Sequence, residues 1–363
     1  QLDRRRPLWE LWFLEGLTND RVAMVMKYHH CLLDGVAGAS LATVLMDIEP
    51  NPAPDPDRAP PPETNIGPEP SDLELFARGI VPTLRTPLRM MRYGQQLFGR
   101  GVAAASFVQR GGQLPSLTDA PRTSFNGVIG PRRALAFASV SLADVRAVKQ
   151  HFEVKVNDVI LALCSSALRG YLADNDELPD KPLTTGVPVS TRAEDDTAMD
   201  NQIATMQVSL ATHVADPAER LRAIHESSQS AKEMTEAVRV RHIQSIGETA
   251  PPVMLDLAFR AAAWTRLLSR VPTVMNTLIS NVPGPPFPLY TAGARVTGIF
   301  PTSVIMEGMG LNITIFSYED RIDFGLHMDP DLISDGWSLA ERIPAAVAEL
   351  MTAGGLGAPT PIV

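Results

Sequence analysis

Apolar and polar residues follow each other along the chain with two kinds of spacing, which predict strands and helices. Alternation with a period of two, or a short apolar run, indicates a strand, and spacing of three and four indicates a helix. The predicted strands are residues 7–14, 22–27, 133–140, 183–190, 202–210, 273–280, 310–318 and 321–328. The predicted helices are residues 35–46, 141–151, 158–173, 216–248, 251–268 and 335–351. This interleaving predicts an α/β (α+β) protein with mixed sheets.

Polar residues mark the expected starts of two of these helices. Ser141 and Asp144 have the spacing of a capping box. Asn157 is expected to cap the following helix, with Asp158 in its first turn, where a negative charge suits the helix dipole. The glycine- and proline-rich tail, residues 353–363, is expected to be loose.

Two segments between the predicted elements have unusual compositions. Residues 50–70 contain nine prolines and predict a surface linker. Residues 76–118 contain six arginines but no lysine and no acidic residue, with leucine and methionine between them. A basic, partly apolar segment of this kind suits an anionic membrane or lipid-droplet surface. A helical hairpin packed on the protein, with its arginines in water, would explain the same composition.

The length and charge of the chain limit its size class and its partners. A chain of 363 residues can bury a substantial core and is expected to form two domains. The net charge of −9 argues against general binding to nucleic acid. The two cysteines suggest no disulfide framework and fit a reducing cytoplasm. No stretch reaches the roughly 18 uninterrupted apolar residues of a membrane-spanning helix.

The most informative residues are His29, His30, Asp34 and Gly35, which lie between a predicted strand and a predicted helix. Imidazole titrates near neutral pH, so it suits the removal of a proton from a hydroxyl or a thiol. Asp34 is better suited to fix the loop than to act as a second base, and Gly35 permits the turn. Arg192 could pair with Asp34 through two parallel hydrogen bonds. Alternatively, the histidine pair is structural and Arg192 is simply solvated.

The pattern His-His-x-x-x-Asp-Gly at residues 29–35 resembles the signature of the acyltransferases built like chloramphenicol acetyltransferase. Other motifs follow in an order that resembles the bacterial wax ester synthase/diacylglycerol acyltransferase family. They are Pro7-Leu8-Trp9, Asn157-Asp158, Pro188-Val189-Ser190-Thr191-Arg192 and Asn281-Val282-Pro283-Gly284-Pro285. The resemblance implies two subdomains with the active-site channel between them. We expect residues 1–117 to belong to the first subdomain and residues 118–363 to form the second.

The resemblance also implies a reaction and roles for the motif residues. A long-chain acyl group would pass from acyl-CoA to diacylglycerol or a fatty alcohol, with His30 as the general base, no acyl-enzyme, no metal and no cofactor. His29 and Asp34 would shape the histidine loop. Asn281, or a backbone N–H group near it, could stabilise the oxyanion. Asn157 and Asp158 are expected to have a mainly structural role at the start of a helix, with Asn157 as a possible contact of the site. Gly284 could support the site, although a simple turn would explain it equally well.

The same resemblance implies a location and a further segment of chain. Because both substrates are apolar, the protein is expected in the cytoplasm, bound peripherally to the inner membrane or to lipid droplets. Members of the family carry on the order of a hundred residues before the position of Pro7, the size of a half-domain. The front of the first subdomain is therefore expected to be missing here and to exist as a separate N-terminal fragment.

Two other functions are compatible with the motifs. One is an acyltransferase of the same fold that takes its acyl group from a carrier protein, as a condensation domain or a polyketide-transferring enzyme does. The other is a non-catalytic lipid-binding protein that has kept the histidine motif. Dependence on a carrier protein would indicate the acyltransferase of the first kind. Lipid binding that is unchanged in His30→Ala would indicate the non-catalytic lipid-binding protein.

Overall fold

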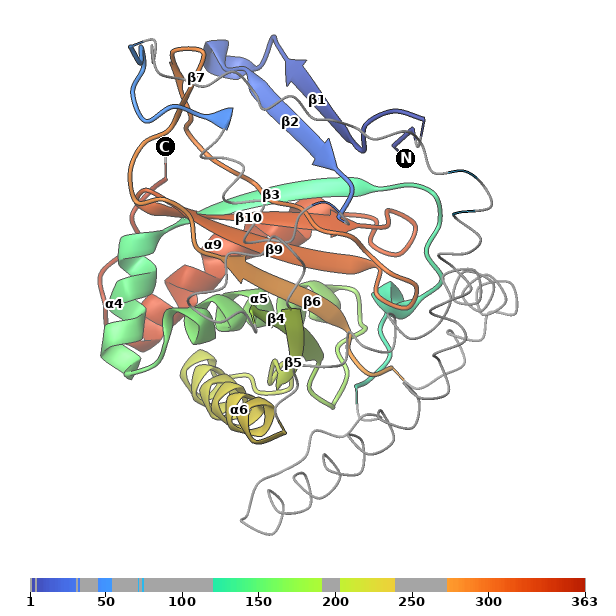
Figure 1. Ribbon diagram of the computed structural model, residues 1–363. Helices are drawn as coiled ribbons and strands as arrows, with labels where there is room; N and C mark the ends of the chain where they lie inside the picture. The colour runs from blue at the N-terminus through green and yellow to red at the C-terminus, as the bar shows by residue number, and fades with distance from the viewer. Residues whose placement is uncertain are drawn as a thin grey trace.

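A six-stranded mixed sheet lies at the centre of the described part of the chain (Figure 1). The computed structural model describes residues 2–3, 5–30, 32, 45–53, 71, 74, 120–190, 203–238 and 273–362. In spatial order the strands are β3 (Ala134–Ser141), β10 (Arg321–Met328), β9 (Leu311–Tyr318), β6 (Thr277–Val282), β4 (Thr184–Ser190) and β5 (Ile203–Ser209). Strand β6 is parallel to β4 and β9, and the other neighbours are antiparallel. The predicted mixed α/β fold is confirmed.

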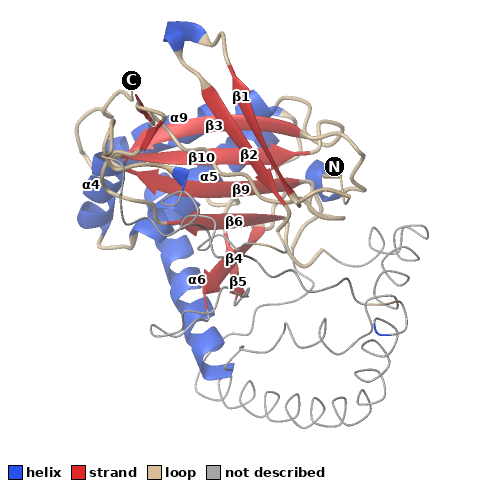
Figure 2. Cartoon of the chain, turned by 45° about the horizontal axis from the view of Figure 1, so that its top comes forward, coloured by secondary structure: helices blue, strands red, loops and turns tan. Residues whose placement is uncertain are grey.

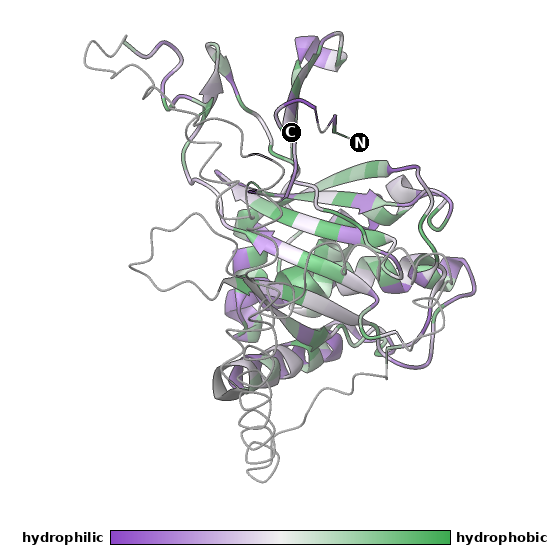
Figure 3. Ribbon diagram, turned by 45° about the vertical axis from the view of Figure 1, so that its right-hand side comes forward, coloured by the Kyte–Doolittle hydropathy of each residue, from purple (hydrophilic) through white to green (hydrophobic). Residues whose placement is uncertain are grey.

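One face of this sheet is covered by helices, and the main core lies between the two layers. The helices are α4 (Leu142–Phe152), α5 (Val156–Asp174), α6 (Pro217–Val238) and α9 (Gly336–Ala353). Alternate strand residues point toward them, such as Ile313 and Ile315 of β9 and Phe324 of β10, all almost fully buried. Figure 3 shows the corresponding alternation of hydrophobic and hydrophilic positions along the strands.

A second, smaller apolar cluster contains Val282, Leu289, Phe316 and Tyr318, with Met46 packed against it. It belongs partly to the segment after β6, which forms the short hairpin β7 (Tyr290–Thr291) and β8 (Ala294–Arg295). Asp47 and Tyr290 exchange two backbone hydrogen bonds of 2.8 Å. The chain that follows the histidine motif is therefore joined directly to the chain that follows β6.

The histidine motif itself follows a two-stranded hairpin of β1 (Trp9–Leu14) and β2 (Ala23–Tyr28). The connecting turn contains a short 3-10 helix, Thr18–Asp20. The hairpin lies on the side of the six-stranded sheet that faces away from the helices (Figures 1 and 2). Apolar side chains point from both of its faces. Trp9 and Phe13 on one face and Trp12 and Leu14 on the other are 47–58% exposed.

Most predicted elements are confirmed, with differences at three places. Helix α5 begins at Val156, so Asn157 lies in its first turn and does not cap it. Strand β6 is shifted toward the C-terminus and includes Asn281, which was expected in the following turn. The tail is not loose at Thr360, whose backbone N–H and hydroxyl groups donate to the Asp144 carboxylate at 2.7 and 2.9 Å.

Several predictions fall outside the described residues. The helices expected at 35–46 and 251–268 lie there, apart from the end of the first, and so does the end of the helix expected at 216–248. The basic segment 76–118 and most of the proline-rich linker 50–70 also lie there. The expected boundary between subdomains at residue 118 stays a prediction.

Candidate functional site

The two histidines lie in a turn that directly follows β2. Tyr28, the last residue of this strand, is paired with Trp9. The backbone N–H of His29 donates to the carbonyl oxygen of Leu8 at 2.9 Å, and the N–H of Leu32 donates to the carbonyl of His29 at 2.9 Å. Two motifs that are 20 residues apart in the sequence, Pro7-Leu8-Trp9 and the histidine pair, are therefore hydrogen-bonded neighbours.

Both histidines are exposed, as a group that must reach a substrate requires. The predicted change from strand to turn at this position is confirmed. Asp34 and Gly35, which complete the motif, lie outside the described residues, and so does Arg192. The ion pair expected between Asp34 and Arg192 therefore stays a prediction.

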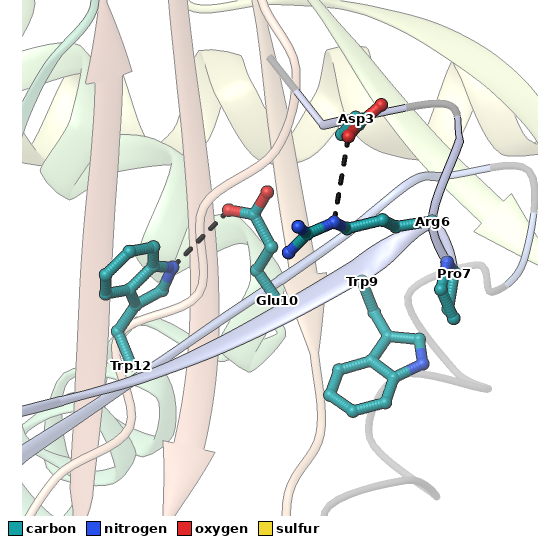
Figure 4. Close-up of a pocket in the computed structure, with 6 residues that line it drawn as sticks. All are labelled: Asp3, Arg6, Pro7, Trp9, Glu10 and Trp12. Carbon is teal, nitrogen blue, oxygen red and sulfur yellow. Dashed lines mark hydrogen bonds and ion pairs between the residues drawn. The ribbon is translucent and has the colours of Figure 1, made fainter.

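A hollow of about 320 Å³ lies beside the first strand of the hairpin (Figure 4). Its lining residues are Asp3, Arg6, Pro7, Trp9, Glu10 and Trp12. The indole N–H of Trp12 donates to Glu10 at 3.4 Å, and Lys27 lies 3.5 Å from the same carboxylate. Arg6 lies 3.8 Å from Asp3, so the hollow combines two large aromatic rings with charged groups that already have partners.

The Asn157-Asp158 motif lies at the start of α5, in the layer of helices. Asp158 is 1% exposed, and its Oδ2 accepts a hydrogen bond from the backbone N–H of Lys155 at 3.0 Å. The same oxygen lies 2.6 Å from Nδ1 of His225 on α6, and Nε2 of that histidine lies 2.7 Å from the Gln229 side chain. Asp158 thus caps α5 and joins it to α6.

Sequence reasoning anticipated a structural role for Asp158 but not its partner. Nothing in the sequence pairs Asp158 with His225, which is 67 residues further on. Among the contacts that the structure describes, none joins this pair to the turn that holds His29 and His30. A direct role of Asn157 in the site stays a prediction.

The segment after β6 is fixed by close packing on β9. Asn281 lies within β6 opposite Ile315. The backbone N–H of Gly284 donates to the Ser317 hydroxyl at 3.1 Å. A Cβ atom at Gly284 would lie 2.2 Å from the carbonyl oxygen of Ser317 and 2.3 Å from the Phe316 ring. Only glycine fits at this position, so the turn after β6 has a defined place against the sheet.

Two other candidate groups, Cys164 and His327, are largely shielded from solvent. Cys164 is fully buried in α5, and burial raises the pKa of its thiol to about 12. His327 on β10 lies 2.5 Å from the carbonyl oxygen of Ser303, and burial lowers its pKa below the usual value. No group of three or more potential metal ligands is present among the residues with described positions. None of the described helices has the length and hydrophobicity needed to span a bilayer.

Two family models match successive parts of the chain. The wax ester synthase/diacylglycerol acyltransferase catalytic domain matches residues 1–160, and the C-terminal domain of the same family matches residues 199–351. A protein of Mycobacterium tuberculosis that is named as a diacylglycerol O-acyltransferase is 34% identical to this chain over 352 residues. The matched residues are 96% of this chain and 68% of the relative. The chain belongs to the wax ester synthase/diacylglycerol acyltransferase family. The resemblance inferred from the motifs is thereby confirmed.

A further relative and two solved structures are also similar to this chain. A protein of Mycobacterium bovis that is also named as a diacylglycerol O-acyltransferase is 38% identical over 336 residues, covering 90% of this chain and 69% of the relative. The solved wax ester synthase/diacylglycerol acyltransferase of Marinobacter aquaeolei VT8 superposes with a TM-score of 0.65 and 30% identity, over 98% of this chain and 74% of that one. A nonribosomal peptide synthetase superposes with a TM-score of 0.53 over all of this chain and 34% of its own. At 14% identity, the latter shows a shared fold alone.

Proposed function

We propose that the protein transfers a long-chain acyl group from acyl-CoA to the hydroxyl of diacylglycerol or of a fatty alcohol, with His30 as the general base. The observation that carries this proposal is the position of the histidine pair. It follows β2 directly, exposed and hydrogen-bonded to the Pro7-Leu8-Trp9 strand, in a chain that belongs to a family of wax ester synthases and diacylglycerol acyltransferases. An imidazole in such a turn can reach a substrate that enters from outside the hairpin.

The proposed reaction is a direct transfer. His30 takes the proton of the acceptor hydroxyl, and the resulting alkoxide attacks the thioester carbonyl carbon. The tetrahedral intermediate collapses, the carbon–sulfur bond breaks, and the CoA thiolate leaves and receives the proton from His30. A general base contributes roughly 10²–10⁴-fold in rate, so positioning and stabilisation of the oxyanion must supply the rest.

Cys164 is not available as a carrier of the acyl group. A thiol with a pKa of about 12 in a fully buried position is neither ionised nor accessible, so this cysteine cannot accept the acyl group. In the proposed direct transfer acyl-CoA is a substrate, and the chemistry needs no cofactor and no metal. Within the proposal, His29, Asp34 and Gly35 shape the loop around His30, and Arg192 pairs with Asp34.

We also propose that the residues around Asn281 supply the donor for the oxyanion. The close packing of Gly284 against β9 supports this role, because a donor must keep a fixed position to favour the transition state. Asp158 supports the site through the position of α5 rather than by touching the substrate, and Asn157 remains a candidate for direct contact. The hydrogen bonds of Asp158 to Lys155 and His225 are the basis for that assignment.

The exposed hairpin supports two further parts of the proposal. A two-stranded hairpin alone is at best marginally stable in water, and β1 and β2 expose apolar side chains on both faces. We propose that a separate N-terminal segment of the protein covers one face. Because both substrates are lipids, we place the working enzyme in the cytoplasm, at the surface of the inner membrane or of lipid droplets.

The proposal is tested by the release of CoA from palmitoyl-CoA by the full-length protein, with hexadecanol or diolein as the acceptor. Wild type, His30→Ala and His213→Ala are compared, and the lipid products are separated by chromatography. His213 is an exposed histidine after β5 and serves as the matched control. We expect release that depends on the acceptor, a loss of about 10²–10⁴-fold in His30→Ala, and no change in His213→Ala.

Two results would contradict the proposal. If His30→Ala is as active as wild type, His30 is not the base. If wild type is inactive with acyl-CoA but active with an acylated carrier protein, the donor is wrong and the carrier-dependent alternative replaces it. Comparison of hexadecanol with diolein assigns the acceptor.

A further inference from the structure

A second hollow lies in the layer of helices, away from the histidine turn. It is a shallow depression of about 650 Å³ where α5, the start of α6 and α9 meet. Alanine and glycine residues form much of its lining, which leaves room for a ligand between the helices. The lining residues with charged or hydroxyl groups are Ser166, Arg169, Arg220, Glu349 and Thr352.

Arg220 is the central charge of this hollow. Its side chain is only 3% exposed, and its Nη1 donates to the carbonyl oxygens of Val214 and Ala215 at 2.9 and 3.0 Å. Its Nη2 donates to the Ser166 hydroxyl at 2.6 Å and to Glu349 at 3.4 Å. Its Nε–H group is buried and has no acceptor among the described residues. A buried donor without a partner is costly, and such groups often face an ion or a ligand.

Positive charge is in excess in this hollow. Arg169 lines it together with Arg220, and its one described acceptor is the neutral carbonyl of Thr212, at 2.6 Å. Glu349 is the single carboxylate of the lining, its side chain is 54% exposed, and its contact with Arg220 is long. Burial is the main cause of the lowered pKa of Arg220, and Arg169 lowers this pKa further, while Glu349 and the neighbouring Asp216 raise it.

The geometry points to an anion-binding site in this hollow, which accepts a phosphate group between Arg169 and Arg220. Guanidinium groups bind phosphate oxygens through paired, charge-assisted hydrogen bonds. Glu349 can swing into solvent when an anion takes its place, because it is held by a single long contact. The alanine-lined remainder of the hollow can receive the part of the ligand that carries the phosphate. This site lies across the sheet from the hairpin and does not depend on the proposed reaction.

The test measures binding of two phosphate sources to the full-length protein at low ionic strength. Isothermal titration with phenyl phosphate tests a soluble ligand. Flotation with phosphatidylcholine vesicles, with or without phosphatidic acid, tests a lipid headgroup. Arg169→Gln removes one cation, Glu349→Gln removes the competing carboxylate, and Arg222→Gln is the control. Arg222 is an exposed arginine of the same helix as Arg220 and lies over the Phe152 ring, outside the hollow.

The two variants should change the affinity in opposite directions. We expect Arg169→Gln to weaken binding at least about tenfold, Glu349→Gln to strengthen it about three- to tenfold, and Arg222→Gln to leave it unchanged. Binding of phenyl phosphate with this pattern identifies a soluble ligand, and the same pattern with phosphatidic acid alone identifies a headgroup. The proposal is overturned if neither probe shows saturable binding. It is also overturned if the affinity is unchanged in both Arg169→Gln and Glu349→Gln. Because Glu349 is exposed, its variant keeps the test valid even if Arg169→Gln does not fold.

Discussion

Replacement of Asp158 by alanine separates a structural role of the Asn157-Asp158 motif from a catalytic one. In the structure Asp158 has two partners through one oxygen, the backbone N–H of Lys155 and the imidazole of His225. Both contacts disappear in Asp158→Ala. If the motif acts by positioning α5 against α6, the variant loses stability but keeps its activity wherever it remains folded.

The size of the expected loss follows from these two contacts. Loss of a helix N-terminal cap costs about 1 kcal/mol. Loss of a hydrogen bond that involves a charged group costs about 1.5–3 kcal/mol when the partners are buried. Asp158 is 1% exposed and His225 22% exposed, so only the lower part of that range applies to the second contact. The sum is about 2.5–3 kcal/mol of unfolding free energy.

Urea unfolding followed by circular dichroism measures this loss, and two further variants resolve it. Asp335→Ala removes an exposed cap of α9 that accepts from the Ser338 backbone at 2.9 Å and has no histidine partner, so it should cost only about 1 kcal/mol. His225→Ala removes the second contact alone. The double variant of Asp158 and His225 should cost less than the sum of the two single variants, because they share one interaction.

A positioning role of Asp158 is contradicted if the unfolding free energy of Asp158→Ala lies within about 0.5 kcal/mol of wild type, which is the range of a surface substitution. The positioning role is also contradicted if the folded variant, assayed well below its unfolding transition, loses CoA release as severely as His30→Ala. The second outcome would assign Asp158 to the chemistry rather than to the position of the helices.

Three further substitutions have defined outcomes. Asn276→Ala should lower the unfolding free energy by about 2–4 kcal/mol. Asn276 is fully buried, accepts a hydrogen bond from the Thr184 backbone at 2.9 Å and donates to two other oxygens. Urea titration measures the loss of stability, and a loss below about 1 kcal/mol would contradict the prediction. Gly284→Ala should cost about 1–3 kcal/mol by overpacking against Ser317, and wild-type stability would contradict that packing. The lowered pKa of His327 means that protonation favours the unfolded chain, so its contribution is complete above about pH 6.5 and is lost as the pH falls toward the lowered pKa. His327→Gln should flatten stability between about pH 7 and pH 5, and an unchanged slope would contradict the assignment.

Local elements could be predicted because their signals are local. The hairpin of β9 and β10 follows from two alternating runs around Glu319 and Asp320, and the structure reproduces it within one residue at each end. The cap of α4 by Ser141 follows in the same way, with the Asp144 N–H donating to the Ser141 hydroxyl at 3.3 Å. The start of α5 was placed too late because the residue at its cap is Lys155, which gives no side-chain signal of a helix start.

The contacts that assemble the protein could not be predicted, because their partners are far apart in the sequence. The Asp144 carboxylate accepts hydrogen bonds from Thr360, and this contact spans 216 residues. The C-terminal end of β6 depends on its parallel neighbour β9, because Asn281 pairs with Ile315 of that strand. Asparagine is uncommon in strands, so the sequence alone does not predict this pairing. For the candidate site, the motif located the histidine turn, but its hydrogen bond to Leu8 required the fold.

The placement of tryptophan gives this protein an optical signal of its own. Two of its four tryptophans, Trp9 and Trp12, lie on the hairpin with more than half of their surface in water. Indole emission moves to shorter wavelength when water is removed from the ring. Any segment or lipid surface that covers the hairpin will therefore change the fluorescence of the unlabelled protein. Single replacements of Trp9 and Trp12 by phenylalanine will show which face of the hairpin has been covered.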